Sequence, residues 1–311
     1  MTVIRIGTRK SKLAMWQTET IARLLKKAGM ETEISSMDTK GDKILDTTIA
    51  KIGSKGVFTE ELEDQLAGGV TDIAVHSAKD LQSTLPEGFE LIAFSRREKV
   101  NDVLVSKNSV DLSDNSKSIR IGTSSVRRVA LLKRFFPHVQ AVDMRGNLQT
   151  RIAKMERGDC DALMLAYAGV HRMGYGDMIV YTFEINSFIP PVGQGCIAIE
   201  AAASLSSDKI AKIRACINDR DSEDCLLAER AFLRKLEGGC SIPAFGLATL
   251  NGDRLTITGG LASLNGHTLL RSTREGSRLD AVALGEAVGE EILRSGGMEL
   301  LEAIRFQQQQ D

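Results

Sequence analysis

The first third of the chain alternates short apolar runs with amphipathic stretches. Four runs are typical of strands: residues 3–7 (VIRIG), 31–37 (ETEISSM), 71–77 (TDIAVHS) and 89–94 (FELIAF). After the first run, Ser11 stands where a helix N-cap is expected, and the helix runs to Lys27 and stops at Gly29. A shorter helix over residues 58–69 is acidic in its first turn and ends at paired glycines. The alternation predicts an α/β domain built on a largely parallel sheet.

A second unit of the same kind begins near Asn101. The stretch IRIGTSSVRRVALLKRF, from Ile119, repeats the Ile-Arg-Ile-Gly-Thr of IRIGTRKSKLAMWQ, from Ile4, and both lead into a helix with arginine at its start. A weaker similarity links DIAVHSAKD (72–80) with DALMLAYAG (161–169). Because the spacings differ, the pattern predicts two lobes of similar architecture, with chance likeness as the alternative. Two such lobes commonly bind a ligand in the cleft between them.

The last third predicts a different, α+β domain. After FIPPVGQG, a strand (196–201) and a helix (208–216) precede a polar linker, NDRDSED (218–224). A helix follows over 222–237. Two Asn-Gly pairs, each flanked by strand-like runs, predict hairpins, because type I′ turns need positive φ at both central residues. A helix over about 280–294, a short terminal helix and a disordered tail, FQQQQD, complete the domain. The expected bounds are 1–97 with 194–216 for the first lobe, 101–190 for the second and 220–311 for the third domain.

Composition narrows the class of protein. A chain of 311 residues is long enough for two or three domains with cores. The net charge of −1 and pI near 6.5 argue against a dedicated nucleic-acid binder. No apolar run approaches the roughly 18 residues of a membrane helix, and the first residues have no apolar signal region, so a cytoplasmic protein with no membrane partner is expected.

The five cysteines predict neither a metal site nor a disulfide framework. No pair has Cys-x-x-Cys spacing, none has a histidine at zinc-site spacing, and the count is odd. Cys240 stands apart from the others in EGGCSIP, behind two glycines at a predicted helix end. A helix C-terminus raises the pKa of a thiol, which disfavours an activated nucleophile. A thiol that reacts once needs no activation, so the stretch favours an attachment point over a nucleophile.

Arginines recur where predicted strands end and helices begin. In an open α/β sheet that edge binds ligands, and helix N-termini there offer free N–H groups. An anionic ligand is implied, although the arginine fork suits carboxylate and phosphate equally well. The alternative is that these are solvated surface charges. The arginines concerned are Arg9, Arg127, Arg128, Arg145 and Arg151.

The stretch VHSAKD adds a candidate carboxylate. Asp80 follows an apolar strand, where it can stabilise a cation or move a proton, or merely cap the next turn. His76 is more often a satisfied histidine at the edge of a core than a base. GSKGVF (53–58) has the glycines of a mobile lid, and equally of an ordinary turn. No glycine-rich phosphate-binding loop precedes a predicted helix, which argues against a nucleotide-binding site.

These motifs together resemble the porphobilinogen deaminase family, also called hydroxymethylbilane synthase. The likeness covers nearly the whole chain in order, and the motifs are specific as a set. They are IRIGTRKSKLAMWQ, KGDKILDTTIAKIGSKGVFTEELE, DIAVHSAKDL, IGTSSVRRVALL, RGNLQTRIAK, LAYAGVHRMG, PVGQG and AERAFLRKLEGGCSIP. Lys12, where many members have proline, and Pro191, where alanine is common, are departures that touch no residue with an assigned role.

The resemblance implies a fold and a reaction. Members have two lobes with the fold of type II periplasmic binding proteins and a small α+β third domain that bears a cofactor. The cofactor is dipyrromethane, made from porphobilinogen and held by a thioether at the cysteine that matches Cys240. Four porphobilinogen molecules are deaminated and joined in turn, and hydrolysis releases hydroxymethylbilane. Separately from the resemblance, the sequence shows no oligomerisation device, so a monomer is the default expectation, and no metal is expected.

The resemblance also assigns residues. Asp80 matches the catalytic aspartate and is also one of the cofactor contacts. The remaining cofactor contacts are Lys79, Ser125, Arg127, Arg128 and Arg145. The substrate contacts are Arg9, Ser11, Arg145, Arg151 and Arg172, together with Lys55 and Phe58 in the lid-like loop.

Two other classes of protein share parts of the pattern. A solute-binding or sensor module can use the same two lobes, but it needs neither Asp80 nor Cys240. A cysteine acyltransferase would need an activated thiolate, which alkylation during turnover would block.

Overall fold

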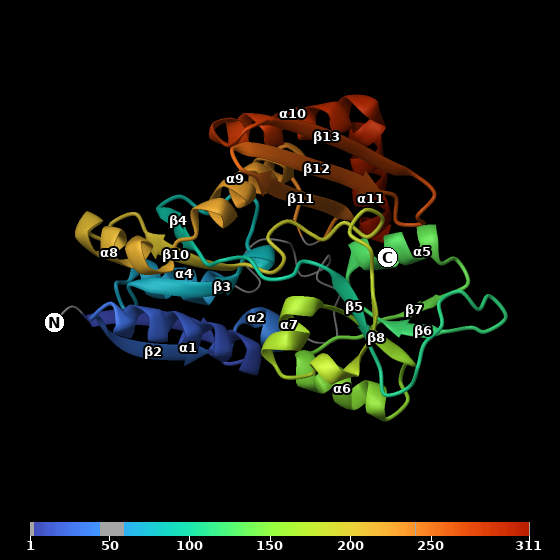
Figure 1. The fold of residues 1–311 in the computed structure, drawn as a ribbon, viewed down its shortest axis with the longest axis horizontal. Helices are drawn as coiled ribbons and strands as arrows, with labels where there is room; N and C mark the ends of the chain where they lie inside the picture. The colour runs from blue at the N-terminus through green and yellow to red at the C-terminus, as the bar shows by residue number, and fades with distance from the viewer. Residues whose placement is uncertain (1–2, 44–58, 240, 311) are drawn as a thin grey trace.

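The computed structural model describes residues 3–43, 59–239 and 241–310, and these form three sheets in three bodies (Figure 1). The first body, lobe 1, has the five-stranded sheet β2-β1-β3-β10-β4. Its elements are β1 (Val3–Arg9), α1 (Lys12–Lys27), β2 (Glu31–Met37), α2 (Lys40–Lys43), α4 (Glu60–Ala67), β3 (Ile73–Ser77), the 3₁₀ turn η1 (Ala78–Asp80), β4 (Phe89–Phe94), β10 (Ile197–Ala202) and α8 (Ser207–Ile217).

The second body, lobe 2, has the five-stranded sheet β7-β6-β8-β5-β9. Its elements are β5 (Asp102–Val105), β6 (Arg120–Gly122), α5 (Val126–Phe135), β7 (Gln140–Val142), α6 (Leu148–Glu156), β8 (Ala162–Ala166), α7 (Tyr167–Arg172), the 3₁₀ turn η2 (Gly176–Met178) and β9 (Ile179–Thr182).

The two lobes have the same sheet plan. In lobe 1, β1 is parallel to β2 and β3, and β10 runs antiparallel between β3 and β4. In lobe 2, β6 is parallel to β7 and β8, and β5 runs antiparallel between β8 and β9. Four strands of each sheet therefore share one direction, and the fifth is reversed. The prediction of two similar α/β lobes with largely parallel sheets is confirmed.

The reversed strands mark where the chain passes between the lobes. Residues 95–101 lead from β4 into β5, and residues 183–196 lead from β9 into β10; we call these the crossing segments. Glycines allow the second segment to pass close to its neighbours. Gly193 (φ +77°) leaves no room for a side chain beside the backbone of Ala78 and Lys79, and Gly195 (φ +89°) is equally close to the Glu98 carbonyl.

The third domain packs two helices on one face of an antiparallel sheet, as Figure 1 shows in orange and red. It consists of α9 (Arg220–Lys235), β11 (Ala244–Asn251), β12 (Arg254–Ala262), β13 (Leu269–Ser277), η3 (Arg278–Asp280), α10 (Ala281–Ile292), η4 (Leu293–Gly297) and α11 (Met298–Gln310). Phe232 is buried at the centre of its core. The domain touches both lobes, since Leu226 packs with lobe 1 residues and Phe245 with lobe 2 residues. The predicted α+β third domain is confirmed.

Glu229 of α9 joins this domain to both crossing segments. Its buried carboxylate pairs with Arg97, with 3.1 Å between Nη2 and Oε2, and accepts the Gly193 N–H at 2.8 Å. It also accepts the Ala248 N–H of β11 at 2.8 Å. One carboxylate therefore bonds to the third domain's own sheet and to both segments that link the lobes.

Local predictions from capping residues are confirmed. The Ser11 side chain accepts the Ala14 N–H and caps α1, which begins at Lys12. Gly29 has the positive φ of a helix stop, and α4 ends immediately before Gly68.

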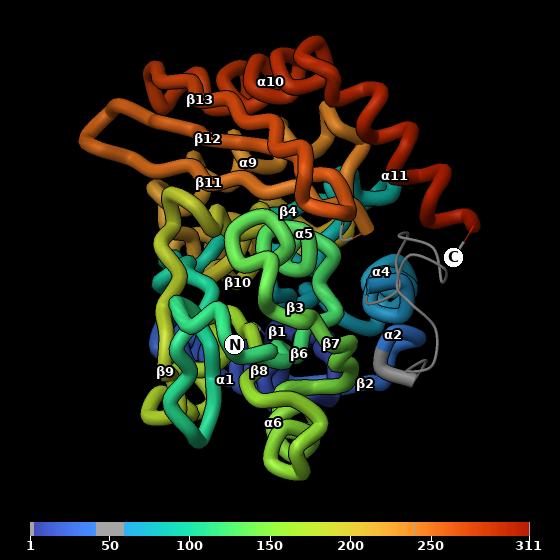
Figure 2. Tube along the Cα trace, turned by 90° about the vertical axis from the view of Figure 1, so that its right-hand side faces the viewer, coloured from blue at the N-terminus to red at the C-terminus, as the bar shows by residue number. Residues whose placement is uncertain are grey.

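Two predictions for the last third of the chain are wrong in part. The linker predicted at 218–224 comprises only Asn218 and Asp219, because the Asp219 side chain caps a helix that begins at Arg220. The tail is helical to Gln310 and lies along the third domain (Figure 2). It is anchored there because Leu301 and Ile304 are buried and the Gln308 side chain donates to the Ser241 carbonyl at 2.6 Å.

Both hairpins predicted from the Asn-Gly pairs form, β11 with β12 and β12 with β13, but neither pair supplies the two central residues of a type I′ turn. Asn251 pairs with Arg254, so the central residues are Gly252 and Asp253, and only Gly252 has positive φ. That pattern suits a type II′ turn. Asn265 lies in a six-residue loop between β12 and β13, where its side chain accepts from Ser263 and His267.

The α9–α10 contact gives a test of this packing. A Cβ at Gly285 would overlap the carbonyl oxygen of Ala228. Alanine favours an isolated helix over glycine by up to about 1 kcal/mol, but overpacking of this kind costs about 1–3 kcal/mol. Gly285→Ala should therefore lower the free energy of unfolding, measured by urea denaturation. Ala283→Ser, on the exposed side of α10, is the control. A Gly285→Ala protein as stable as the parent would contradict the packing described.

Candidate functional site

A pocket of about 50 Å³ lies in lobe 1 where β1 and β3 end side by side. Its lining includes Arg9, at the end of β1, Ser11, at the N-cap of α1, and Asp80, at the end of η1. The structure thus brings together three residues that the sequence assigned separately. The Gln17 side chain donates to the Ser77 hydroxyl at 2.8 Å and ties α1 to β3 beside the pocket.

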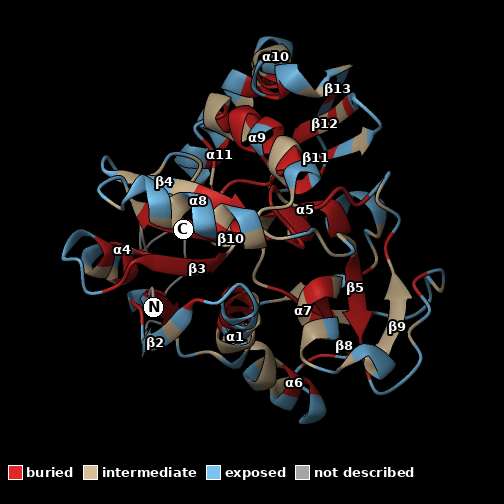
Figure 3. Cartoon of the chain, turned by 60° about the vertical axis from the view of Figure 1, so that its left-hand side comes forward, coloured by how far each residue is buried: buried red, intermediate tan, exposed pale blue. Residues whose placement is uncertain are grey.

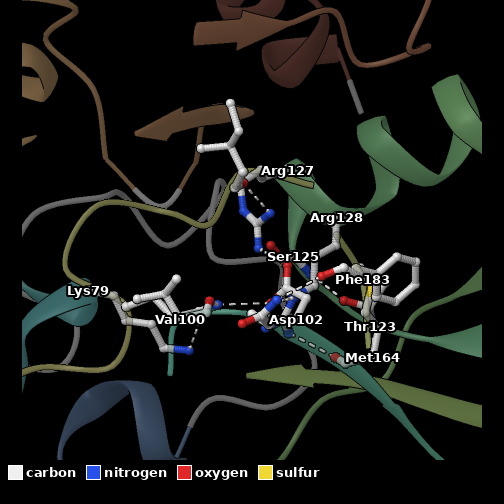
Figure 4. Close-up of polar contacts among 12 residues, drawn as sticks. Lys79, Val100, Asp102, Thr123, Ser125, Arg127, Arg128, Met164 and Phe183 are labelled. Atoms are coloured by element: carbon white, nitrogen blue, oxygen red, sulfur yellow. Dashed lines mark hydrogen bonds and ion pairs between the residues drawn. The ribbon is translucent and has the colours of Figure 1, made fainter. Parts of the chain in front are cut away.

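The predicted arginine pair of lobe 2 faces inward. Arg127 and Arg128 are in the first turn of α5, and only 3% and 6% of their surface is exposed. Both bind Asp102, at the start of β5, with contacts of 2.6 Å from Arg127 Nη2 and 2.7 Å from Arg128 Nη2 (Figure 4). They also donate to the carbonyl oxygens of Ile189 and Met164, at 2.9 and 2.8 Å.

Gln194 extends this network across the crossing segments to Lys79 of lobe 1. The Gln194 amide nitrogen donates to the Val100 carbonyl at 2.7 Å and to Asp102 at 3.1 Å. Its amide oxygen accepts from Lys79 Nζ at 3.3 Å. Figure 4 shows the network as far as Lys79, which is the neighbour of Asp80 on η1.

The electrostatics of this region show an excess of positive charge. Burial, and then the charge of Arg128, lower the pKa of Lys79 to about 8. Burial and Arg128 likewise lower the pKa of Arg151 to about 10, although Asp80 acts in the opposite direction. Burial alone would raise the pKa of Asp102, but the guanidinium groups of Arg127 and Arg128 hold it well below its ordinary value. The site is therefore suited to an anionic ligand.

Arg145 and Arg151 belong to the same group, at the start of α6. Arg151 Nε donates to the Gly146 carbonyl at 2.7 Å, which fixes the guanidinium near the helix N-terminus. The Arg145 carbonyl accepts from Lys154 Nζ at 3.2 Å. Arg128, Arg145 and Asp80 all act on the pKa of Arg151, so lobe 2 cations and the lobe 1 carboxylate lie close together.

Ser125 is the N-cap residue of α5, and its N–H donates to the Thr123 hydroxyl at 3.3 Å. Its own side chain does not cap the helix. Beside it, Arg127 Nε is buried without a hydrogen-bond partner. A buried donor in that state costs free energy, and an anion reaching it would recover the loss.

Arg172 is held by the crossing segments. Its Nε donates to Glu98 at 3.0 Å, its Nη2 donates to the Gly195 carbonyl at 2.8 Å, and its guanidinium lies 5.6 Å from the centre of the Trp16 ring. Of the remaining assigned residues, Lys55, Phe58 and Cys240 lie outside the described residues.

Sequence reasoning missed Asp102 and Gln194. Asp102 was visible only as an acidic residue opening the apolar run DVLV, and Gln194 only as the polar residue between two glycines of VGQG. Within the described ranges, no group of three or more His, Cys, Asp or Glu side chains is placed to hold a metal ion, and no helix is long and apolar enough to cross a membrane.

The arginine network gives a test that includes pH. Asp102→Asn leaves two buried guanidinium groups without their carboxylate, and breaking a buried pair costs about 3–5 kcal/mol of stability. Because the folded pKa of Asp102 is depressed, its stabilisation is complete above the unfolded value of about 3.9 and is lost as pH falls further. Urea unfolding should show a constant deficit from pH 7 to pH 5 that shrinks in stronger acid.

The control is Asp208→Asn, which removes an exposed carboxylate paired with Lys212. Its effect should stay below about 1 kcal/mol. A deficit for Asp102→Asn no larger than this would show that the network does not depend on Asp102.

Comparison with known proteins gives a consistent result. Residues 4–212 match the family model described as "Porphobilinogen deaminase, dipyromethane cofactor binding domain", and residues 223–294 match "Porphobilinogen deaminase, C-terminal domain". A porphobilinogen deaminase of Desulfosudis oleivorans is 61% identical over 98% of this chain and 99% of its own. One of Cytophaga hutchinsonii is 53% identical over 97% of both chains.

Solved structures match at a much lower level. The methionine-binding protein MetQ covers 69% of this chain and 89% of its own, with 9% identity and a TM-score of 0.44. The aliphatic sulphonate binding protein SsuA of Escherichia coli has 14% identity and a TM-score of 0.41, over 75% of this chain and 70% of its own.

The two family models together match residues of both lobes and of the third domain, and the curated relatives match over nearly the full length of the chain. This chain belongs to the porphobilinogen deaminase family.

Proposed function

We propose that this chain deaminates porphobilinogen at Asp80 and joins four units on a dipyrromethane primer attached at Cys240, before hydrolysis releases hydroxymethylbilane. The observation that carries the proposal is the pocket that Asp80 shares with Arg9 and Ser11, beside the cations of lobe 2. A carboxylate surrounded by cations suits a substrate with acidic side chains whose reaction passes through a cation.

The substrate carboxylates account for the excess of cations. Arg9, Ser11, Arg145 and Arg151 hold the acetate and propionate groups of the incoming pyrrole. Each charge-assisted hydrogen bond is worth about 1.5–3 kcal/mol. Burial, and then the charge of Arg128, lower the pKa of Arg151, and a bound anion would offset both effects, which supports this assignment.

Asp80 carries the chemical step. Loss of ammonia from the aminomethyl group leaves positive charge on the methylene carbon and the pyrrole ring. The carboxylate of Asp80 accepts the pyrrole N–H and stabilises that charge as it develops. It is held in place from the start, because η1 follows directly from the buried strand β3.

The chain's residues also fit the cofactor. Dipyrromethane bears carboxylates, and Lys79, Ser125, Arg127 and Arg128 form a cationic wall beside the pocket, with Arg127 Nε buried and unpartnered. When bound, the cofactor supplies the pyrrole end to which the first unit is joined. The arginines keep their positions through Asp102, so that the wall is formed by the protein itself.

Further parts of the assignment follow the family. We assign Arg172, Lys55 and Phe58 to substrate contacts, Arg172 through the nitrogen that Glu98 and Gly195 leave available. We place the domain bounds at 1–97 with 194–216, 101–190 and 220–311. We also propose a cytoplasmic monomer.

Asp80→Asn tests the catalytic assignment. The amide keeps the size of the side chain but loses the charge that stabilises the cation, and one such preorganised partner is worth about 2.7–4 kcal/mol, or a hundred- to thousandfold in rate. Stability should change by less than about 0.5 kcal/mol. Single-turnover ammonia release on cofactor-loaded protein and thermal unfolding measure the two effects.

Asp64→Asn, on the exposed face of α4, is the matched control and should change neither. If Asp80→Asn turned over within about threefold of the parent and lost about 1 kcal/mol of stability, Asp80 would be a turn-capping residue.

Cys240→Ser tests the attachment site. Serine is nearly isosteric but cannot form the thioether, so the variant should fold, lack activity and have the mass of its sequence alone. Intact-mass spectrometry of the parent should show the added dipyrromethane. Cys216→Ser, at a partly exposed free cysteine, should keep both the added mass and the activity. Added mass retained on Cys240→Ser would place the attachment elsewhere.

A further inference from the structure

A buried acidic cluster lies beneath the catalytic pocket. His76 of β3 pairs in register with Ala198 of β10, and Glu200 pairs with Ala74, so both side chains are on the same face of the sheet. His76 Nε2 lies 2.9 Å from Glu200 Oε2. His76 also lines the pocket that contains Asp80. The imidazole is therefore the link between the buried carboxylate and the site of reaction.

Two helices, α4 and α9, lie close to the cluster. α4 covers this face of β3, which is buried along its length (Figure 3), and contributes the buried carboxylate of Glu63. Burial, and then the nearby charge of Glu200, raise the pKa of Glu63. From α9, Arg230 lies near enough for Glu200 to act on its pKa, but its guanidinium donates to the carbonyls of Gln82 and Ser83.

The polar atoms of this cluster are not satisfied by hydrogen bonds. His76 Nε2, both oxygens of Glu200 and one oxygen of Glu63 are buried without a hydrogen-bond partner. The 2.9 Å contact between His76 Nε2 and Glu200 Oε2 is thus close, but it lacks aligned hydrogen-bond geometry. A buried carboxylate in that state is strongly unfavourable unless a proton or a cation neutralises it.

The reaction releases a proton for which the pocket needs an acceptor. When a new carbon–carbon bond forms at a pyrrole carbon, that carbon must lose its hydrogen before the ring is aromatic again. Asp80 is engaged with the developing cation at that moment. We propose that His76, supported by Glu200, accepts this proton in each condensation; the inference rests on the proposed function.

The step balances without another reagent. The C–H bond breaks, its electron pair returns to the pyrrole ring, and the proton passes to the imidazole. With Nε2 against Glu200, Nδ1 is the ring nitrogen that accepts. The carboxylate stabilises the resulting imidazolium, as a carboxylate does for histidine bases in general. The proton then passes to the ammonia released in the same round, which leaves as ammonium.

Two variants test the inference. His76→Gln keeps a polar side chain without a basic nitrogen, and Glu200→Gln removes the supporting charge. Both should release the first ammonia at the parent's rate but form product about a hundredfold more slowly, the lower end of what a general base supplies. Porphobilinogen deuterated at its free pyrrole carbon should then react more slowly than the unlabelled substrate by a larger ratio than in the parent, because C–H cleavage becomes rate-limiting.

A second readout needs no turnover. The ¹⁵N spectrum of the histidine ring reports which nitrogen carries the hydrogen, and the parent should show His76 protonated on Nε2. Glu200→Gln should remove that preference. Thr71→Val removes another buried, unpartnered hydroxyl of lobe 1, before the start of β3. It is the control for disturbing the core and should alter neither readout.

The outcomes separate the two proposals. A parent enzyme that releases no ammonia would refute the proposed function itself. A parent that works, with His76→Gln showing the parent's product rate and the parent's isotope effect, would refute the role of His76. Unfolding of His76→Gln is distinguished by circular dichroism, and the Glu200→Gln spectrum then decides alone: an unchanged tautomer would overturn the inference.

Discussion

The carboxylate of Asp102 is the constraint on which the rest of the site depends. Two guanidinium groups as deeply buried as those of Arg127 and Arg128 repel each other and are costly to remove from water. Asp102 makes that burial possible by contacting both, and it does so from the first residue of β5, where the chain has just crossed from lobe 1. The positions of the cations are therefore set by the same residue that starts the sheet of lobe 2.

Buried side-chain hydrogen bonds also hold the segments that link the lobes. Gln194 bonds to Asp102 and to Lys79, and Glu229 bonds to both crossing segments from the third domain. The third domain contacts these segments through the Glu229 carboxylate. None of its described side chains lines the pocket. Arg127 and Arg128 belong to lobe 2 and Asp80 to lobe 1, so the contacts between the lobes help to set the distance between these charges.

Local signals in the sequence predicted most elements, because they depend on neighbouring residues. Ser11 caps a helix through its own hydroxyl, and Gly29 stops it through its own φ. Asp102 and Gln194 escaped prediction because their partners lie 25 and 92 residues away, so no local pattern marks them. The tail shows the same limit: FQQQQD has the composition of a disordered end, but the contact between Gln308 and Ser241 is made only in the folded protein.

The insertion of β10 between β3 and β4 determines the order in which the sheets can be completed during synthesis. Lobe 2 draws all of its strands from residues 102–182, whereas the sheet of lobe 1 must wait for residues 197–202. On the ribosome, the lobe that begins first is therefore the last of the two to close. Until then, β3 and β4 present unpaired edges, which are templates for pairing with other chains. The nascent chain is most exposed to aggregation while the whole of lobe 2 is being made.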